Sequence, residues 1–275
     1  MLTASQIDRW LREDIGHHDV TNDVAGETSG RLVAKETGVA AGIEAAAAVF
    51  DHLGVDADRE IDDGDAIDAG ETVLTTSGPA RETLRAERVA VNLAGHASGV
   101  ATTTRVAVDR ADGVSTDVRI AGTRKTTPGL RGIEKRAIAA GGGDTHRLDL
   151  SQMVMIKENH IAEMGLETAV ETFRERASFA TKIEVEAEAA EQAQRAAAAG
   201  ADIVLLDNMT PAETEVTVDA LDDLGDDATD VLTEASGGIT IGDVADYAAT
   251  GVDIISMGSL THSASSLDFS FRTGE

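Results

Sequence analysis

Cysteine is absent from the 275 residues, which excludes disulfide bonds, thiolate nucleophiles and zinc sites built on cysteine. Aromatic residues make up only 3%, so alanine and valine must build most of the core. No stretch approaches the roughly 20 apolar residues of a transmembrane helix, and the first residues lack the apolar run of a signal peptide. These absences predict a cytoplasmic protein without a membrane partner.

Positive charge is also scarce. Asp and Glu total 50 against 23 Lys and Arg, which gives a net charge of −27, and only five of the bases are lysines. Nucleic acid and anionic membranes repel such a surface, so neither is expected as a partner. An excess of acids with few lysines is typical of adaptation to high salt, as in a haloarchaeal protein, because the Debye length shortens to about 3 Å at 1 M. An ordinary acidic enzyme is the alternative.

One segment reverses this charge balance. Between Arg119 and Lys157, eight bases face three acids, a local sum of +5. Clustered positive charge is costly unless an anion binds to it, so the segment predicts an anion site. Arg124 and Lys125 follow one apolar run and Lys157 follows another, which places these cations at the ends of expected strands.

The pattern of expected elements changes after Gly113. Upstream, short strands and helices predict a small α/β layer, followed by a largely apolar helix that starts at Ser77 and is broken at Gly95 and Gly99. Downstream, apolar runs alternate with Ala-rich helical stretches, which predicts a parallel sheet in a doubly wound fold or a (β/α) barrel, complete or incomplete. The expected strands are 118–121, 153–156, 183–187, 203–206, 231–232 and 254–257.

Polar residues at the carboxyl ends of these strands favour the barrel, because barrel active sites form at that face. The residues in question are Lys157, Glu186, Asp207, Glu234 and Gly258. Glu186 and Asp207 are expected on neighbouring strands, where they either form salt bridges inside the barrel or bind sugar hydroxyls directly or through Mg²⁺.

Glycines follow the last two expected strands. Gly237 and Gly238 precede a predicted helix, and Gly258 lies just past the final strand. Backbone amides freed of side chains can approach a phosphate closely, and barrel loops at these positions commonly bind one. With Arg124, Arg147 and Lys157 on the other side, the sequence predicts a phosphorylated sugar beside an anionic second substrate.

These segments resemble the quinolinate phosphoribosyltransferase family over nearly the whole chain, from about Glu13 to Phe271. The resemblance implies an α/β fold with an N-terminal α/β sandwich, residues 1–112 rejoined by about 266–275, and an incomplete C-terminal α/β barrel, residues 113–265. It also implies a homodimer with shared active sites and leaves higher oligomers open. The matching motifs are AERVAVNLAGHASGVAT, TRKTTPGLR, GGGDTHR, IKENHI, IEVEAE, LLDNM, EASGGI and GVDIISMGSLTHS.

The family's reaction is a pentosyl transfer in NAD biosynthesis. Phosphoribosyl passes from 5-phosphoribosyl 1-pyrophosphate to quinolinate with loss of CO₂, giving nicotinate mononucleotide and pyrophosphate. The resemblance implies Mg²⁺ bound with the pyrophosphate substrate and no organic cofactor.

The family's roles carry over by position. The residues that are expected to hold the two carboxylates of quinolinate are Arg124, His146, Arg147 and Lys157, with Arg88 of the partner subunit completing the pocket. The expected catalytic residues are Lys125, at the phosphoribosyl pyrophosphate, and Glu186 and Asp207, at the ribose hydroxyls and the Mg²⁺. The 5′-phosphate is assigned to Ser236, Gly237, Gly238 and Gly258. Departures from the family pattern at Gly122, Thr145, Gln152 and Glu158 remove no charged ligand and bear on the fine positioning of Arg124 and Arg147.

Three other interpretations stay open. A paralogue of the same fold would act on nicotinate or a related acid, or belong with molybdate transport. A barrel aldolase would form a Schiff base through Lys157 or Lys182. A non-catalytic protein would only bind a phosphorylated ligand.

Overall fold

The computed structural model describes residues 2–225 and 231–274, and the chain divides into two compact units. The first unit comprises Met1–Arg105, Pro128–Gly142 and Ser263–Glu275, and the second comprises Val106–Thr127 and Gly143–His262. Residues 128–142 therefore lie outside the unit in which the sequence placed them. The physical reason is burial, because Ile133, Ala137 and Ile138 pack into the core of the first unit.

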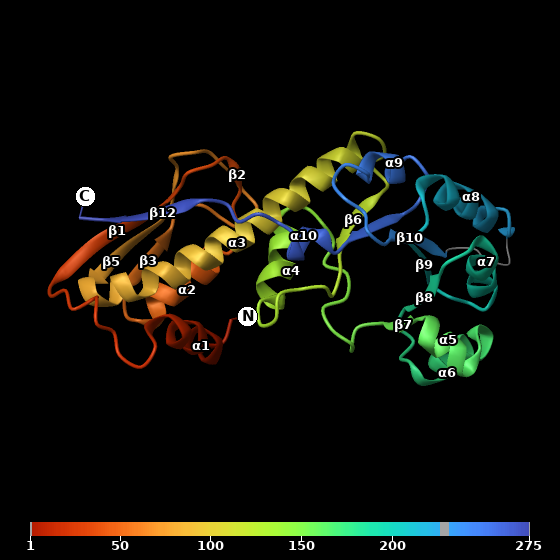
Figure 1. Ribbon diagram of the computed structural model, residues 1–275, viewed down its shortest axis with the longest axis horizontal. Coiled ribbons are helices and arrows are strands. Elements are labelled where there is room, and N and C mark those ends of the chain that lie inside the picture. Colours follow the sequence, from red (N-terminus) through yellow and green to blue (C-terminus); the bar gives the residue numbers. More distant parts are fainter. Residues whose placement is uncertain (1, 226–230, 275) are drawn as a thin grey trace. The chain divides into compact units, whose positions relative to one another are not determined.

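A four-stranded antiparallel sheet forms the centre of the first unit, in the order β12-β1-β5-β3 (Figure 1). Strand β12 pairs with β1, and Leu32 lies opposite Phe271. The C-terminal residues therefore rejoin the first unit, as the sequence predicted. A separate two-stranded sheet joins β2 to β4. The strands are β1 (Glu27–Ala34), β2 (Gly38–Val39), β3 (Asp56–Arg59), β4 (Ala66–Ile67), β5 (Thr72–Pro79) and β12 (Phe269–Thr273).

Helices complete the core of this unit. They are α1 (Ala4–Ile15), α2 (Ile43–His52), α4 (Arg131–Ala140) and the part of α3 (Ala80–Asp112) up to residue 105. The start of α1 is fixed by a capping box, in which the Thr3 hydroxyl accepts from the Gln6 N–H and the Gln6 side chain accepts from the Thr3 N–H. Phe50 of α2 stacks on Phe271 with ring centroids 5.3 Å apart, which ties α2 to the returning strand.

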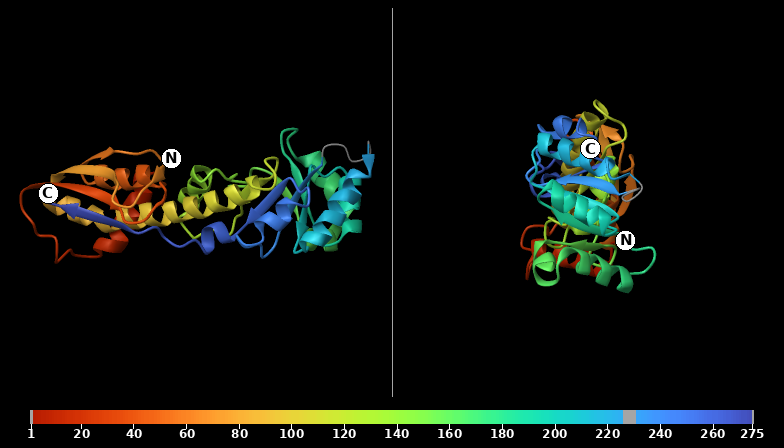
Figure 2. Two further views of the ribbon diagram at one scale, coloured as in Figure 1. Left: turned by 90° about the horizontal axis from the view of Figure 1, so that it is seen from above. Right: turned by 90° about the vertical axis from the view of Figure 1, so that its right-hand side faces the viewer.

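The long helix α3 corrects two expectations. It begins at Ala80, because residues 77–79 belong to β5, and it continues without a break through Gly95 and Gly99 (Figure 2, yellow). These glycines allow the chain that leads into β12 to pass close to the helix. A Cβ on Gly95 would lie 2.9 Å from the Leu267 carbonyl oxygen, and the Leu267 N–H donates to the Gly95 carbonyl at 2.9 Å.

The second unit is built on a six-stranded parallel sheet, in the order β6-β11-β10-β9-β8-β7. All six expected strands are present: β6 (Arg119–Gly122), β7 (Val154–Ile156), β8 (Ile183–Ala187), β9 (Ile203–Asp207), β10 (Leu232–Ser236) and β11 (Ile254–Met257). Within this sheet β6 pairs with β11, the strand of the sheet that comes last in the sequence. β6 and β7 follow each other along the chain but form the two opposite edges of the sheet. The sheet therefore forms an incomplete barrel, and α4, which connects these two edges in sequence, belongs to the first unit.

Short helices connect the parallel strands, and their apolar faces pack on a core that includes Ile156, Val185 and Leu206. The helices are α5 (Glu158–Met164), α6 (Leu166–Arg176), α7 (Ala190–Ala198), α8 (Pro211–Asp222), α9 (Val244–Ala248) and α10 (Ser259–His262). No helix within residues 2–225 and 231–274 is both long and apolar enough to span a bilayer. Because all strands run the same way, their carboxyl ends meet at one edge and define where a site can form.

Replacing Gly99 by alanine tests the close approach of the returning chain to α3. The new Cβ would lie 2.0 Å from the Ser265 carbonyl oxygen, so we expect the free energy of unfolding to fall by about 1–3 kcal/mol. Gly132→Ala in α4 is the control, because its Cβ would meet nothing within 4 Å, so the free energy of unfolding should change little. Chemical denaturation measures both variants, and a Gly99→Ala protein as stable as its parent would contradict the packing.

Candidate functional site

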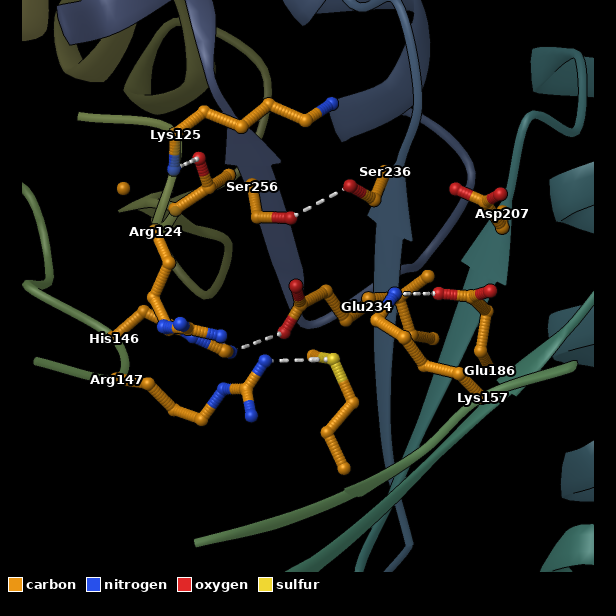
Figure 3. Close-up of a pocket in the computed structure, with 14 residues that line it drawn as sticks. Arg124, Lys125, His146, Arg147, Lys157, Glu186, Asp207, Glu234, Ser236 and Ser256 are labelled. Atoms are coloured by element: carbon orange, nitrogen blue, oxygen red, sulfur yellow. Dashed lines mark hydrogen bonds and ion pairs between the residues drawn. The ribbon is translucent and has the colours of Figure 1, made fainter. Parts of the chain in front are cut away.

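A cavity of about 340 Å³ opens at the carboxyl ends of the parallel strands (Figure 3). All six strands of the sheet contribute to its lining, together with the loop that precedes β7. The predicted site residues that line it are Arg124, Lys125, His146, Arg147, Lys157, Glu186, Asp207 and Ser236. The structure therefore brings together side chains that the sequence placed at separate strand ends.

Two arginines, Arg124 and Arg147, line this cavity. Arg147 is 8% exposed, and one of its terminal nitrogens donates to the Met155 sulfur at 2.8 Å. The Nε atoms of Arg124 and Arg147 are buried and have no hydrogen-bond partner among the described residues. Burial lowers the pKa of Arg147, the charge of Glu184 opposes this effect, and Arg124 adds to it. Guanidinium groups that have donors without a protein partner are suited to planar carboxylates.

Two glutamates lie behind these cations and are almost fully buried. Glu234 of β10 is 1% exposed, and its Oε2 lies 3.0 Å from Nε2 of His146. Glu184 of β8 is 0% exposed, and its Oε2 lies 3.8 Å from the same nitrogen. Burial and then the charge of Glu234 raise the pKa of Glu184 to about 8, although His146 and Arg147 act to lower it. Because its pKa is raised, Glu184 is mostly protonated at neutral pH, and the two glutamates together carry less than two negative charges beneath the cations.

The sequence missed Glu184 as a site residue and placed Glu234 only at a strand end. Alternate residues of a strand point to the same face, so Glu184 and Glu186 of β8 both face the interior of the barrel. The spacing of two in IEVEAE was the signal that could have found Glu184.

The opposite part of the cavity contains the two predicted carboxylates. Asp207 of β9 has a raised pKa, first because of burial and then because of the charge of Glu186, while Lys157 and Lys125 lower it. Asn208 donates from Nδ2 to Asp207 Oδ2 at 2.7 Å. Two carboxylates on neighbouring strands that repel each other are a donor set that suits Mg²⁺, so the residues present fit the expected metal.

Lys157 and Glu186 form an ion pair with each other. The sequence had assigned Lys157 to the binding of the quinolinate carboxylates and Glu186 to the binding of the ribose. The structure places both side chains in one cavity, where they contact each other (Figure 3). Lys182, the other lysine considered for a Schiff base, is 58% exposed, lies 3.6 Å from Asp202 and does not line the cavity.

The glycine-rich loops adjoin the cavity beside Ser236 and Lys125. Ser236 and Ser256 approach each other with their hydroxyl oxygens 3.0 Å apart. Gly237 has a φ of 102°, and a Cβ there would lie 2.3 Å from Asn208 Oδ1. At Gly258, a Cβ would lie 2.9 Å from Cδ of Lys125.

The helix expected directly behind Gly237 and Gly238 begins only at Val244 and has five residues. The intervening Thr240 N–H already donates to Asp243 Oδ2 at 3.0 Å. Backbone amides for a phosphate must therefore come from the glycine loop itself.

Arg88 is, like Gly237, Gly238 and Gly258, a predicted site residue that does not line this cavity. It lies on α3 in the first unit, its side chain is 59% exposed, and its nearest ion-pair partner is the adjacent Glu87 at 3.8 Å. The sequence had assigned it to the active site of a partner subunit.

Comparison with known proteins identifies the family. The family model for the quinolinate phosphoribosyl transferase N-terminal domain matches residues 19–98, and the model for the C-terminal domain matches residues 100–272. The probable nicotinate-nucleotide pyrophosphorylase (carboxylating) of Methanothermobacter thermautotrophicus is 46% identical over 95% of each chain. The human nicotinate-nucleotide pyrophosphorylase (carboxylating) is 40% identical over 98% of this chain and 91% of its own.

A solved structure agrees with these sequence matches. The crystal structure of NadC from Streptococcus pyogenes superposes with a TM-score of 0.89 at 38% identity, covering 100% of this chain and 98% of that one. The chain therefore belongs to the quinolinate phosphoribosyl transferase family.

Proposed function

We propose that this protein transfers phosphoribosyl from 5-phosphoribosyl 1-pyrophosphate to quinolinate with loss of CO₂, giving nicotinate mononucleotide and pyrophosphate. The observation that carries the proposal is one cavity with two arginines whose buried Nε atoms have no partner among the described residues, and two carboxylates at neighbouring strand ends. The relatives that are 40–46% identical over nearly the whole chain, and whose names include the carboxylating activity, support the same reaction.

The cationic side fits the diacid. Arg124 and Arg147 have open donors for planar carboxylates, and His146 adds a third polar contact within the same lining. Because these groups are already fixed by burial, they bind the diacid with little loss of side-chain freedom. The pyridine nitrogen is thereby held where it can attack the anomeric carbon of the ribose.

The carboxylate side fits the ribosyl donor. As pyrophosphate leaves, positive charge develops on the ribose, and Glu186 and Asp207 stabilise that charge electrostatically. The same carboxylates would hold Mg²⁺, which supplies neutralisation of the leaving pyrophosphate when bound. Lys157 must exchange Glu186 for a substrate carboxylate, and Lys125 lies beside Gly258, where a phosphate is expected.

Loss of CO₂ follows from the charge of the intermediate. Once the ring nitrogen carries the ribose it is a pyridinium, and its positive charge stabilises the electron pair that the departing 2-carboxylate leaves on C2. The chemistry therefore requires no organic cofactor.

Glu186→Gln tests the role of the ribose-side carboxylate. It removes one charge that stabilises the transition state, so we expect kcat to fall roughly 100-fold, measured as nicotinate mononucleotide formed with and without Mg²⁺. Glu188→Gln is the matched control, because Glu188 is exposed and lies two residues further along the same segment. Full activity of Glu186→Gln would contradict the assignment, and turnover of nicotinate in place of quinolinate would favour the paralogue.

The proposal includes a homodimer in which Arg88 of the partner subunit completes each cavity. The exposure of Arg88 on α3 leaves it available to another chain. We expect Arg88→Ala and Lys157→Ala to be nearly inactive alone and to recover about a quarter of the parent activity after subunit exchange, because half of randomly mixed dimers contain one intact site. No recovery in mixtures that gel filtration and labelling show to be exchanged would refute the shared site. Assembly beyond the dimer and a cytoplasmic location stay predictions.

The proposal also includes function at high salt. The net charge of −27 opposes the approach of two anionic substrates, and salt screens that repulsion, with a Debye length of about 10 Å at 0.1 M and 3 Å at 1 M. The buried contacts of Arg147 are screened much less than surface charges. We expect activity at fixed Mg²⁺ to hold or rise as KCl is added from zero, and a steady fall would count against this adaptation.

A further inference from the structure

His146 has a backbone conformation that non-glycine residues rarely adopt. Its φ of 50° lies in the left-handed region. Among the described non-glycine residues, only Asn208 also has a positive φ. Such a conformation costs about 1–3 kcal/mol and persists where the surroundings fix it. Here Asp144 Oδ1 accepts from the His146 N–H at 2.6 Å, and Glu234 Oε2 lies 3.0 Å from the ring Nε2.

The buried carboxylate determines which ring nitrogen carries a hydrogen. Glu234 Oε2 lies 3.0 Å from Nε2 of His146 (Figure 3). When Glu234 is ionised it can only accept a hydrogen bond, so Nε2 then keeps its hydrogen in either charge state of the ring. Any proton that His146 gives up must therefore leave from Nδ1. A carboxylate that fixes an imidazole in this way is the arrangement that enzymes use to orient a general acid or base.

The proposed reaction needs one proton at a defined atom. When the bond between C2 and its carboxylate breaks, CO₂ leaves without a proton and the electron pair stays on C2 beside the pyridinium nitrogen. That carbon must then gain a hydrogen. Arg124 and Arg147 cannot supply it, because a guanidinium does not give up its proton in proteins.

We propose that His146 is the general acid that protonates C2 as CO₂ departs, with Glu234 as its positioning residue. This step rests on the proposed function. The imidazolium transfers its Nδ1 proton to C2, the C–H bond forms with the electron pair left by the carboxylate, and the ring becomes neutral with its Nε2 hydrogen still bound to Glu234. The ring recovers its proton from solvent when the product leaves.

A metal ion is the competing use of the same side chains. Ligand atoms of His146, Glu184 and Glu234 lie within 4.8 Å of one another. Arg147 interacts with both glutamates and already supplies positive charge beside them, which opposes a dication. Coordination at Nε2 would also displace the hydrogen bond to Glu234.

The test follows pyrophosphate and CO₂ in one reaction, with saturating quinolinate labelled in its 2-carboxylate. The parent protein is expected to release both at the same rate. In His146→Gln, pyrophosphate release should continue while CO₂ release slows by about 10²–10⁴-fold, so that a mononucleotide with both carboxylates accumulates. Glu234→Gln should show a smaller lag of CO₂ behind pyrophosphate.

The control is His52→Gln, because His52 also pairs with a carboxylate, Asp8 at 2.8 Å, but lies in the first unit away from the cavity lining. It should leave both rates unchanged. Equal slowing of pyrophosphate and CO₂ in folded His146→Gln, or no slowing of either, would overturn the role of His146 as an acid. Stoichiometric Zn²⁺ binding that is lost in Glu234→Gln would overturn it as well. Absence of pyrophosphate release from the parent protein would instead refute the proposed function on which the step rests.

Discussion

The site depends on the compensation of buried charge. Arg147 and His146 lie far from water beside Glu234 and Glu184, which two strands of the same sheet supply and which share the compensation of their charge. The strands that supply the glutamates also form the core, so the position of the cations is fixed by the packing of the barrel. In a molecule with a net charge of −27, this internal pairing lets a few cations face a ligand without being neutralised by the acidic surface.

The arrangement of the open barrel explains why cations and carboxylates line the same cavity. Six parallel strands direct their carboxyl ends to one edge, so side chains from residues 122 to 256 meet there despite their separation in sequence. The ion pair between Lys157 and Glu186 is a result of this crowding. Each of these residues compensates the charge of the other.

Much of the fold could be predicted because its signals are local. The six apolar runs became the six strands, and Arg124, Lys157, Glu186 and Asp207 sit at strand ends as their positions in the sequence required. The predicted break of α3 failed because Gly95 and Gly99 serve a contact with residues more than 160 positions away, which no local pattern records. Glu184 was missed for a related reason. A glutamate within an apolar strand can be recognised as a site residue only from its contacts in space, here with His146 and Arg147.

The place of β12 has a consequence for how the protein is made. The edge strand of the first sheet comes from the last residues of the chain, and Phe271 covers Phe50, which was synthesised more than two hundred residues earlier. While the ribosome still holds the C-terminal segment, β1 has an unpaired edge and Phe50 lacks its aromatic neighbour. Completion of the N-terminal layer must therefore wait until β12 has been synthesised and has left the ribosome, even though most of the layer's residues emerge first.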